Sequence, residues 1–187
     1  KEIKKYQKSE QLKEKKVKTV VCRTNEDGTF NLENFRKCFS ARTKVVSVVP
    51  VSNLDGVANP IKEIVKIAHE KKAIILVDGA QSFPHKEVDV EELELDFFVL
   101  SGHKALGPTG VGVLYGKKNL LEKIPPFLVG GHTVVDSTYE GYTLAPVPER
   151  FEAGLQDYAG IIGFGEACRY LKKIGLNEIE KHELKLK

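Results

Sequence analysis

The sequence predicts an α/β fold of three layers, in which helices cover a mainly parallel, mixed β-sheet with one antiparallel strand. Three apolar runs, 44–49, 73–77 and 96–100, are too short for helices and read as buried strands. The segments between them leave room for helices, as in βαβ units. The run 111–115 follows the third strand so closely that no crossover helix fits, so this strand should be antiparallel.

Upstream of this sheet the sequence predicts a helix, a strand and a second helix. Residues 1–16 are rich in Lys and place apolar side chains at rough helical spacing, as in a solvated amphipathic helix. Residues 17–22 form a short apolar run before turn residues at 25–28, which predicts a strand. Asn31 is expected to cap a helix whose apolar face carries Leu32, Phe35, Cys38 and Phe39.

Two further helices and one irregular segment are expected downstream. A helix begins at Pro60, whose fixed backbone suits a first turn, and continues through Ala68. Residues 117–148 change to Pro-Pro, Gly-Gly and scattered Thr and Tyr, a long irregular excursion that in a compact domain is usually functional or interfacial. Residues 158–174 resume helical spacing, and three glycines there would allow close backbone packing: Gly160, Gly163 and Gly165.

The composition excludes several classes of protein. With 187 residues and 41% apolar side chains, the chain can bury the core of one domain, and no apolar run approaches the roughly 18 residues that cross a membrane. Residues 1–18 hold eight Lys, and the remaining chain has 21 Lys and Arg against 23 Asp and Glu, which argues against nucleic-acid binding. Three scattered cysteines give neither a disulfide framework nor a metal site, and no secretory segment precedes residue 17, so a reducing cytoplasm is expected.

Polar side chains follow the ends of the three predicted parallel strands, where α/β sheets bind their ligands. Taken alone, Asp78-Gly79 reads as a turn, Lys104 as a surface lysine and His103 as a loop residue. Together, a carboxylate and a lysine at neighbouring strand ends match pyridoxal phosphate, whose ring nitrogen needs an acid partner and whose aldehyde needs an amine. The polar residues at these ends are Ser52, Asn53, Asp78, Gln81, Ser101, His103 and Lys104.

The motifs that carry these residues resemble those of the class V aminotransferase superfamily of pyridoxal-phosphate enzymes. V-S-N at 51–53, V-D-G-A-Q at 77–81, S-G-H-K at 101–104 and R-F-E-A-G at 150–154 appear in the family's order and spacing. Within the superfamily, S-G-H-K-x-x-G-P-T-G and R-F-E-A-G are similar to the motifs of group II cysteine desulfurases and selenocysteine lyases. The resemblance extends from about residue 19 to residue 179 and implies the large domain of a pyridoxal-phosphate-dependent transferase.

The resemblance also implies roles for individual side chains. Lys104 would bind the cofactor aldehyde covalently and move protons at the substrate Cα. Asp78 would pair with the protonated ring nitrogen, and Gln81 would hydrogen-bond to the phenolic oxygen. Asn53 would lie near the substrate carboxylate and the same phenolic oxygen.

The phosphate group would be held by Ser101 and His103, with Gly102 allowing its close approach. The remaining histidines at 69, 85 and 182 match no catalytic position and are expected to be surface or loop residues. No metal is implied.

Two positions depart from the family pattern. Pro50 precedes V-S-N where family members commonly have His, and Leu155-Gln156 follow R-F-E-A-G where the family usually has Thr-Pro. That Thr reaches a phosphate in the partner subunit, so this chain lacks the hydroxyl for the contact.

By resemblance, the protein is a cytoplasmic, homodimeric cysteine desulfurase. It would take sulfur from L-cysteine as an enzyme-bound persulfide, leave L-alanine, and serve an acceptor or scaffold protein, for example in iron–sulfur cluster assembly. Another class V reaction, such as selenocysteine lyase or aminotransferase chemistry, and a non-catalytic fragment remain alternatives.

Residues 1–187 are expected to be part of the cofactor-binding large domain, without the family's N-terminal segment and C-terminal small domain. The nucleophilic cysteine belongs to that small domain, so the chain alone is expected to be inactive. The chain's own cysteines are expected to pack as small apolar side chains: Cys22, Cys38 and Cys168.

Overall fold

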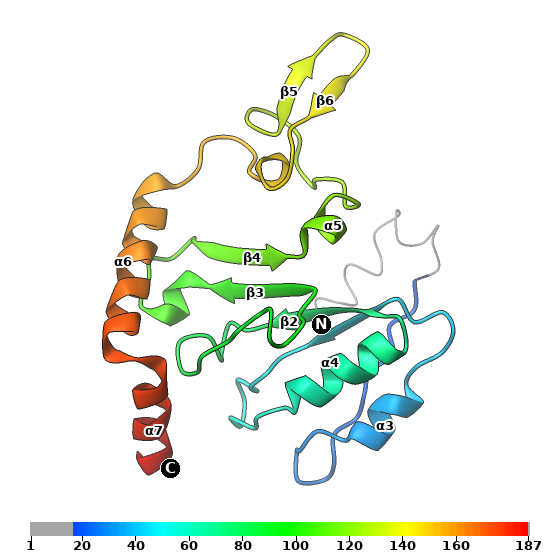
Figure 1. Cartoon of the computed structure of the whole chain (residues 1–187), viewed down its shortest axis with the longest axis vertical. Coiled ribbons are helices and arrows are strands. Elements are labelled where there is room, and N and C mark those ends of the chain that lie inside the picture. Colours follow the sequence, from blue (N-terminus) through cyan, green and yellow to red (C-terminus); the bar gives the residue numbers. More distant parts are fainter. Residues whose placement is uncertain (1–16, 187) are drawn as a thin grey trace. The chain divides into compact units, whose positions relative to one another are not determined.

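The computed structural model describes residues 17–186, which fall into two compact units, one ending at Arg42 and one beginning at Thr43 (Figure 1). The helix predicted at 1–16 lies outside the described residues. In the first unit, α3 (Leu32–Lys37) begins as predicted, because the Asn31 side chain accepts a hydrogen bond of 2.7 Å from the Asn34 N–H. Phe35 of α3 is buried between two edge-on aromatic rings, those of Phe30 and Phe39.

The prediction of a strand at residues 17–22 is wrong. Residues 17–24 have no regular structure, and Val20 and Val21 are 54% and 78% exposed. Residues 17–42 contain no strand that pairs with this run. A β-strand needs a neighbour for its backbone N–H and C=O groups, and an apolar run alone does not supply one.

The second unit is built on a four-stranded sheet that confirms the predicted topology. Its strands are β1 (Val45–Val48), β2 (Ile74–Asp78), β3 (Phe97–Ser101) and β4 (Gly112–Gly116), in that spatial order. β1, β2 and β3 are parallel, and β4 runs antiparallel to β3. The sheet is therefore mixed and mainly parallel, with the antiparallel strand at one edge.

Helix α4 (Ile61–Glu70) connects β1 to β2 and packs against the sheet (Figure 1). It follows Pro60, as predicted, and buries one apolar face made of Ile64, Val65, Ile67 and Ala68. The cover of the sheet is uneven. Ile75 and Val77 of β2 are fully buried, whereas the alternate residues Ile74 and Leu76 are only half-buried.

The segment predicted as irregular, 117–148, contains more regular structure than expected. It holds the short helix α5 (Lys118–Leu121) and a separate two-stranded antiparallel sheet of β5 (Val134–Ser137) and β6 (Tyr142–Leu144). The hairpin closes through a hydrogen bond of 2.8 Å from the Thr138 N–H to the Gly141 carbonyl. These strands are too short to give a clear alternating pattern in the sequence.

Two helices end the described chain. α6 (Tyr158–Ile174) has the predicted bounds and is capped by Asp157, which accepts a hydrogen bond of 2.9 Å from the Gly160 N–H. Gly175, at a left-handed φ of 89°, ends α6, and α7 (Leu176–Leu186) follows. In residues 17–186, no helix combines the length and the apolar character needed to cross a membrane.

Candidate active site

The sheet brings the two main chemical segments to one edge, as the sequence predicts. Asp78 is the last residue of β2 and pairs with Val99 on the parallel neighbour β3. Ser101 lies two residues further along β3, which is about 4.8 Å from β2. A 3₁₀ turn, η1 (Gly102–Ala105), follows directly and carries Lys104. The Asp78 carboxylate and the Lys104 amine therefore leave neighbouring strands at the same end.

The loop after Asp78 turns back immediately at Gly79. The Asp78 carboxylate accepts a hydrogen bond of 3.0 Å from the Ala80 N–H, and the Phe83 N–H donates to the Gly79 carbonyl at 2.8 Å. A Cβ on Gly79 would overlap the ring of Phe98 on β3, so only glycine lets the loop lie this close to the neighbouring strand. This turn leaves Gln81 half-buried, three residues past Asp78.

The turn after β3 exposes an imidazole and an amine. Ser101 Oγ lies 3.0 Å from His103 Nδ1, which pairs the hydroxyl and imidazole that the resemblance assigns to phosphate. His103 and Lys104 are both exposed. Leu106 then adopts a left-handed φ of 61°, which ends the turn and lets the Gly107 N–H donate to the Gly102 carbonyl at 2.9 Å.

Gly102 has a role in packing that the sequence did not reveal. The resemblance assigns this glycine to the approach of a phosphate group. In the structure, a Cβ at Gly102 would lie 2.9 Å from the Val111 carbonyl oxygen and 3.3 Å from the Phe164 ring. The contact with Val111, directly before β4, and with Phe164 of α6 is sufficient reason for glycine here.

Asn53 lies at the same edge of the sheet as Asp78 and Lys104, but it is further along the chain from the end of its strand. It is exposed in the loop that follows β1, five residues beyond Val48. A bridge between Val51 and Ala58 closes this loop, and Asn59, which the sequence reading overlooked, holds it through a 2.7 Å hydrogen bond to the Val49 carbonyl.

A buried ionic cluster occupies the opposite ends of the same strands. Asp96, directly before β3, has a side chain only 9% exposed. Its carboxylate accepts hydrogen bonds from Lys117 Nζ at 2.8 Å, the Ile75 N–H at 2.9 Å and His69 Nε2 at 3.0 Å. Burial opposes ionisation of Asp96, but the hydrogen bonds from these three donors outweigh it and hold its pKa below the usual value. His69, expected to be a surface or loop residue, is instead half-buried in the last turn of α4 and bonded to this carboxylate.

The R-F-E-A-G segment lies against the Gly-Gly loop of the 117–148 excursion. The Gly154 N–H donates to the Gly131 carbonyl at 2.9 Å, and Arg150 Nε donates to the Ala145 carbonyl at the same distance. These two bonds fix the end of the excursion to the segment that leads into α6.

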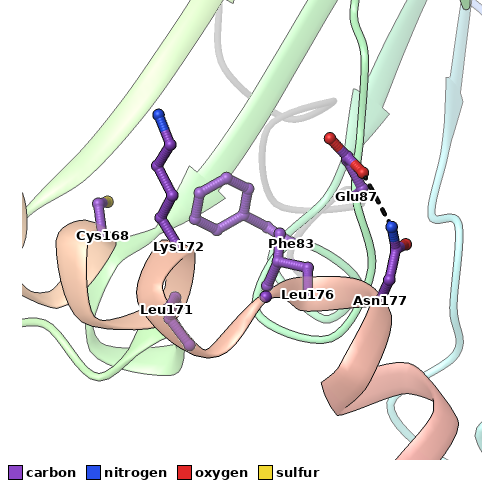
Figure 2. Close-up of a pocket in the computed structure, with 8 residues that line it drawn as sticks. Phe83, Glu87, Cys168, Leu171, Lys172, Leu176 and Asn177 are labelled. Atoms are coloured by element: carbon purple, nitrogen blue, oxygen red, sulfur yellow. Dashed lines mark hydrogen bonds between the residues drawn. The ribbon is translucent and has the colours of Figure 1, made fainter.

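A pocket of about 350 Å³ lies where α6 meets α7, away from the strand ends. Figure 2 shows Phe83, Leu171 and Leu176 lining it, together with Lys172 and the hydrogen bond between Asn177 and Glu87. None of the six residues assigned to the cofactor lines this pocket. The candidate active site is therefore the open edge formed by the strand ends.

The three cysteines are free thiols, and two of them lie in surroundings that disfavour the thiolate. Burial and the neighbouring Cys38 raise the pKa of Cys22 to about 11. Burial also raises the pKa of Cys168. In the described part of the chain, no three His, Cys, Asp or Glu side chains are grouped in a way that could hold a metal ion.

The fold agrees with that of the relatives of this chain. The chain belongs to the aminotransferase class-V family, whose model matches residues 7–187. Enzymes of this family depend on pyridoxal phosphate. Over 161 residues, or 86% of the chain, it is 51% identical to a probable cysteine desulfurase of Halalkalibacterium halodurans and 45% identical to a cysteine desulfurase of Haloferax volcanii.

Solved structures give the same result. The apo structure of a cysteine desulfurase from Thermococcus onnurineus NA1 matches 94% of this chain with a TM-score of 0.87 and 40% identity, over 44% of its own chain. The cysteine desulfurase CsdA of Escherichia coli matches 85% of this chain with a TM-score of 0.82 and 34% identity, over 40% of its own chain. The chain spans about 40% of the length of the curated relatives it matches.

Proposed function

We propose that this chain is the pyridoxal-phosphate-binding part of a cysteine desulfurase. The observation that carries the proposal is the placement of Asp78 and Lys104 at the same ends of two neighbouring parallel strands. The similarity to proteins named cysteine desulfurases supports L-cysteine as the substrate. Residues 1–187 then form part of the large domain.

The residues at the strand ends fit the chemical groups of this cofactor. A carboxylate, an amine and a hydroxyl–imidazole pair leave one edge of the sheet, and they match the ring nitrogen, the aldehyde and the phosphate of pyridoxal phosphate. When bound, the cofactor supplies an electron-withdrawing ring that stabilises negative charge at the substrate Cα.

Lys104 would hold the cofactor through its aldehyde and would serve as the base that moves a proton at the substrate Cα. Its side chain is exposed at the strand end, where a substrate can reach it. Asp78 would keep the ring nitrogen protonated, and Gln81 would donate a hydrogen bond to the phenolic oxygen. Asn53 orients the substrate carboxylate.

The phosphate is bound by Ser101 and His103. Their side chains already lie within hydrogen-bond distance of one another, so both can reach the same anion. Lys104 follows His103 in the same turn, so the amine and the phosphate-binding pair would hold one cofactor together.

The sulfur step requires a thiolate. It attacks the substrate sulfur, the Cβ–Sγ bond breaks, its electron pair remains on Cβ, and a proton there completes L-alanine while the thiol becomes a persulfide. The raised pKa values of Cys22 and Cys168 disfavour both as this nucleophile. Cys38 is half-buried at the C-cap of α3, where it packs as a small apolar side chain. We therefore assign the sulfur-accepting thiol to none of the three.

The proposed enzyme is a homodimer that passes sulfur to an acceptor or scaffold protein, with iron–sulfur cluster assembly as one destination. We place it in the cytoplasm, since all three cysteines are unpaired.

The proposal is tested on the protein that carries this chain. After incubation with pyridoxal phosphate and reduction with borohydride, peptide mapping should find the pyridoxyl group on Lys104. Lys104→Ala should abolish alanine formation from L-cysteine, because both the cofactor amine and the proton carrier are lost, while the control Lys123→Ala, at an exposed lysine outside the site, retains it. A pyridoxyl group on another lysine would contradict the assignment. Turnover of L-selenocysteine but not L-cysteine would instead support a selenocysteine lyase.

A further inference from the structure

Helix α6 packs against the turn that carries Lys104. The contact is made at glycines, whose missing side chains let the two segments approach closely. Gly102 and Gly107 flank that turn. A Cβ at Gly102 would lie 3.3 Å from Cδ2 of Phe164, and one at Gly107 would lie 2.6 Å from the same atom. The Phe164 ring therefore occupies the space that both glycines leave open.

The contact continues along the helix and the turn. A Cβ at Gly163 would lie 2.9 Å from Pro108, and one at Gly160 would lie 2.6 Å from Val111 Cγ2. Gly165, predicted with them to pack closely, faces open space instead. The helix backbone thus lies directly on the segment 102–111, and the Phe164 ring packs between them.

Phe164 also belongs to an apolar cluster that supports both cofactor loops. Its buried members are Ala105, Phe164, Ala167 and Leu171. Ala105 is the neighbour of Lys104. Phe83 packs against the same cluster, and its N–H bonds the Gly79 carbonyl in the loop that begins at Asp78. One cluster therefore lies behind both the Asp78 loop and the Lys104 turn.

We propose that Phe164 is a positioning residue for the cofactor site. Its ring holds the Lys104 turn at a fixed distance from the loop that carries Asp78 and Gln81. This role rests on the proposed function, because the distance matters only if both loops bind the same cofactor. Loss of the ring leaves the two glycine backbones without packing, and the turn relaxes toward α6.

The test compares two Phe→Leu variants of the protein that carries this chain. Phe164 and Phe97 are 8% and 7% exposed, but Phe97 lies at the first position of β3, the opposite end from Lys104. Both variants lose the same ring from a core site. Amide hydrogen exchange is measured for peptides covering 102–107 and 79–83, followed by the apparent Kd for pyridoxal phosphate and the pH profile of the bound cofactor's absorbance.

Phe164→Leu should accelerate exchange in both peptides and weaken cofactor binding at least tenfold more than Phe97→Leu, a difference of about 1.4 kcal/mol. Phe164→Leu should also shift the pH profile of the bound cofactor's absorbance, whereas a general loss of stability would not change that profile. If Phe164→Leu fails to fold, Phe164→Met, which is closer in volume, is expected to show the same effects at smaller size.

Equal Kd values and pH profiles for the two Leu variants would overturn the positioning role and leave the proposed function standing. Faster exchange in Phe164→Leu without a change in cofactor binding would also overturn it. If the wild-type protein takes up no pyridoxal phosphate, the proposed function fails, and the positioning role fails with it.

Discussion

Replacement of Asp96 by Asn is expected to lower the free energy of unfolding by about 1.5–3 kcal/mol, the usual contribution of a hydrogen bond to a charged group. The Asp96 carboxylate accepts three hydrogen bonds in a site where its side chain is 9% exposed. An amide keeps one acceptor oxygen, enough for the Ile75 N–H. That oxygen takes the place of Oδ2, which also accepts from His69 Nε2, so the NH₂ group faces Lys117 Nζ, and the hydrogen bond from Lys117 is lost.

The loss of unfolding free energy in Asp96→Asn should lie in the lower part of this range. The Lys117 side chain is 36% exposed, so water replaces part of its interaction with Asp96. Lys117 Nζ also keeps its second hydrogen bond, to the Glu94 carbonyl at 3.1 Å. Asp96→Ala removes every acceptor and leaves the Ile75 N–H buried without a partner, so it should cost more, about 3–5 kcal/mol.

The pH dependence has a definite sign. The pKa of Asp96 is lower in the native protein than in the unfolded chain, where it is about 3.9. A carboxylate of this kind stabilises the fold above its unfolded pKa and loses that contribution as the pH falls through its native pKa. The contribution of the Asp96 carboxylate, and with it the difference between wild type and Asp96→Asn, should therefore be present at pH 7 and shrink below about pH 4.

Urea denaturation measures both effects. At pH 7 the unfolding midpoint of Asp96→Asn should fall by about 1 M with the slope unchanged, since slopes are about 1–3 kcal/mol per M. The control Glu92→Gln breaks an exposed ion pair with Lys62 and should leave the midpoint in place. Equal midpoints for wild type and Asp96→Asn at pH 7, or a difference that grows on acidification, would refute the reasoning.

Three further predictions concern the candidate site. Asp78→Asn should reduce turnover more than Gln81→Ala, because Asp78 stabilises a charged ring nitrogen and Gln81 contributes one neutral hydrogen bond of about 0.5–1.5 kcal/mol; side-by-side rates decide the ranking. Gly79→Ala should cost about 1–3 kcal/mol in urea denaturation, because its Cβ overlaps the Phe98 ring. Single Ala variants should keep alanine formation from L-cysteine at each of the three cysteines, Cys22, Cys38 and Cys168. Loss of activity in any variant would show that this cysteine is the nucleophile.

The central sheet and the placement of its strand ends were predictable because both depend on short stretches of sequence. Each parallel strand is a compact apolar run that ends in residues of different chemistry, so Asp78 and Lys104 could be placed at one edge without knowledge of side-chain contacts. The antiparallel direction of β4 followed from the shortness of the connection before it.

Features that depend on contacts between distant segments were not predictable. Asp96 binds His69 and Lys117, which are 27 and 21 residues away, and only the register of the strands brings the three together. Phe164 fits the helical pattern of α6 like any other core residue, and nothing in its own sequence shows that it meets Gly102 and Gly107. The run at 17–22 is apolar enough for a strand. A strand also needs a neighbouring strand to pair with, and the sequence of the run does not show whether one is present.

The mixed topology of the sheet also bears on the order in which the site assembles during folding. β3 and β4 are joined by residues 102–111 alone, whereas residues 79–96 separate β2 from β3 and residues 49–73 separate β1 from β2. Closing the shorter connection costs less chain entropy, so the β3–β4 pair is the most local pairing in the sheet. The Lys104 turn lies within that connection. We expect the turn to take shape with this pairing, and the Asp78 loop to join it when β2 is added alongside.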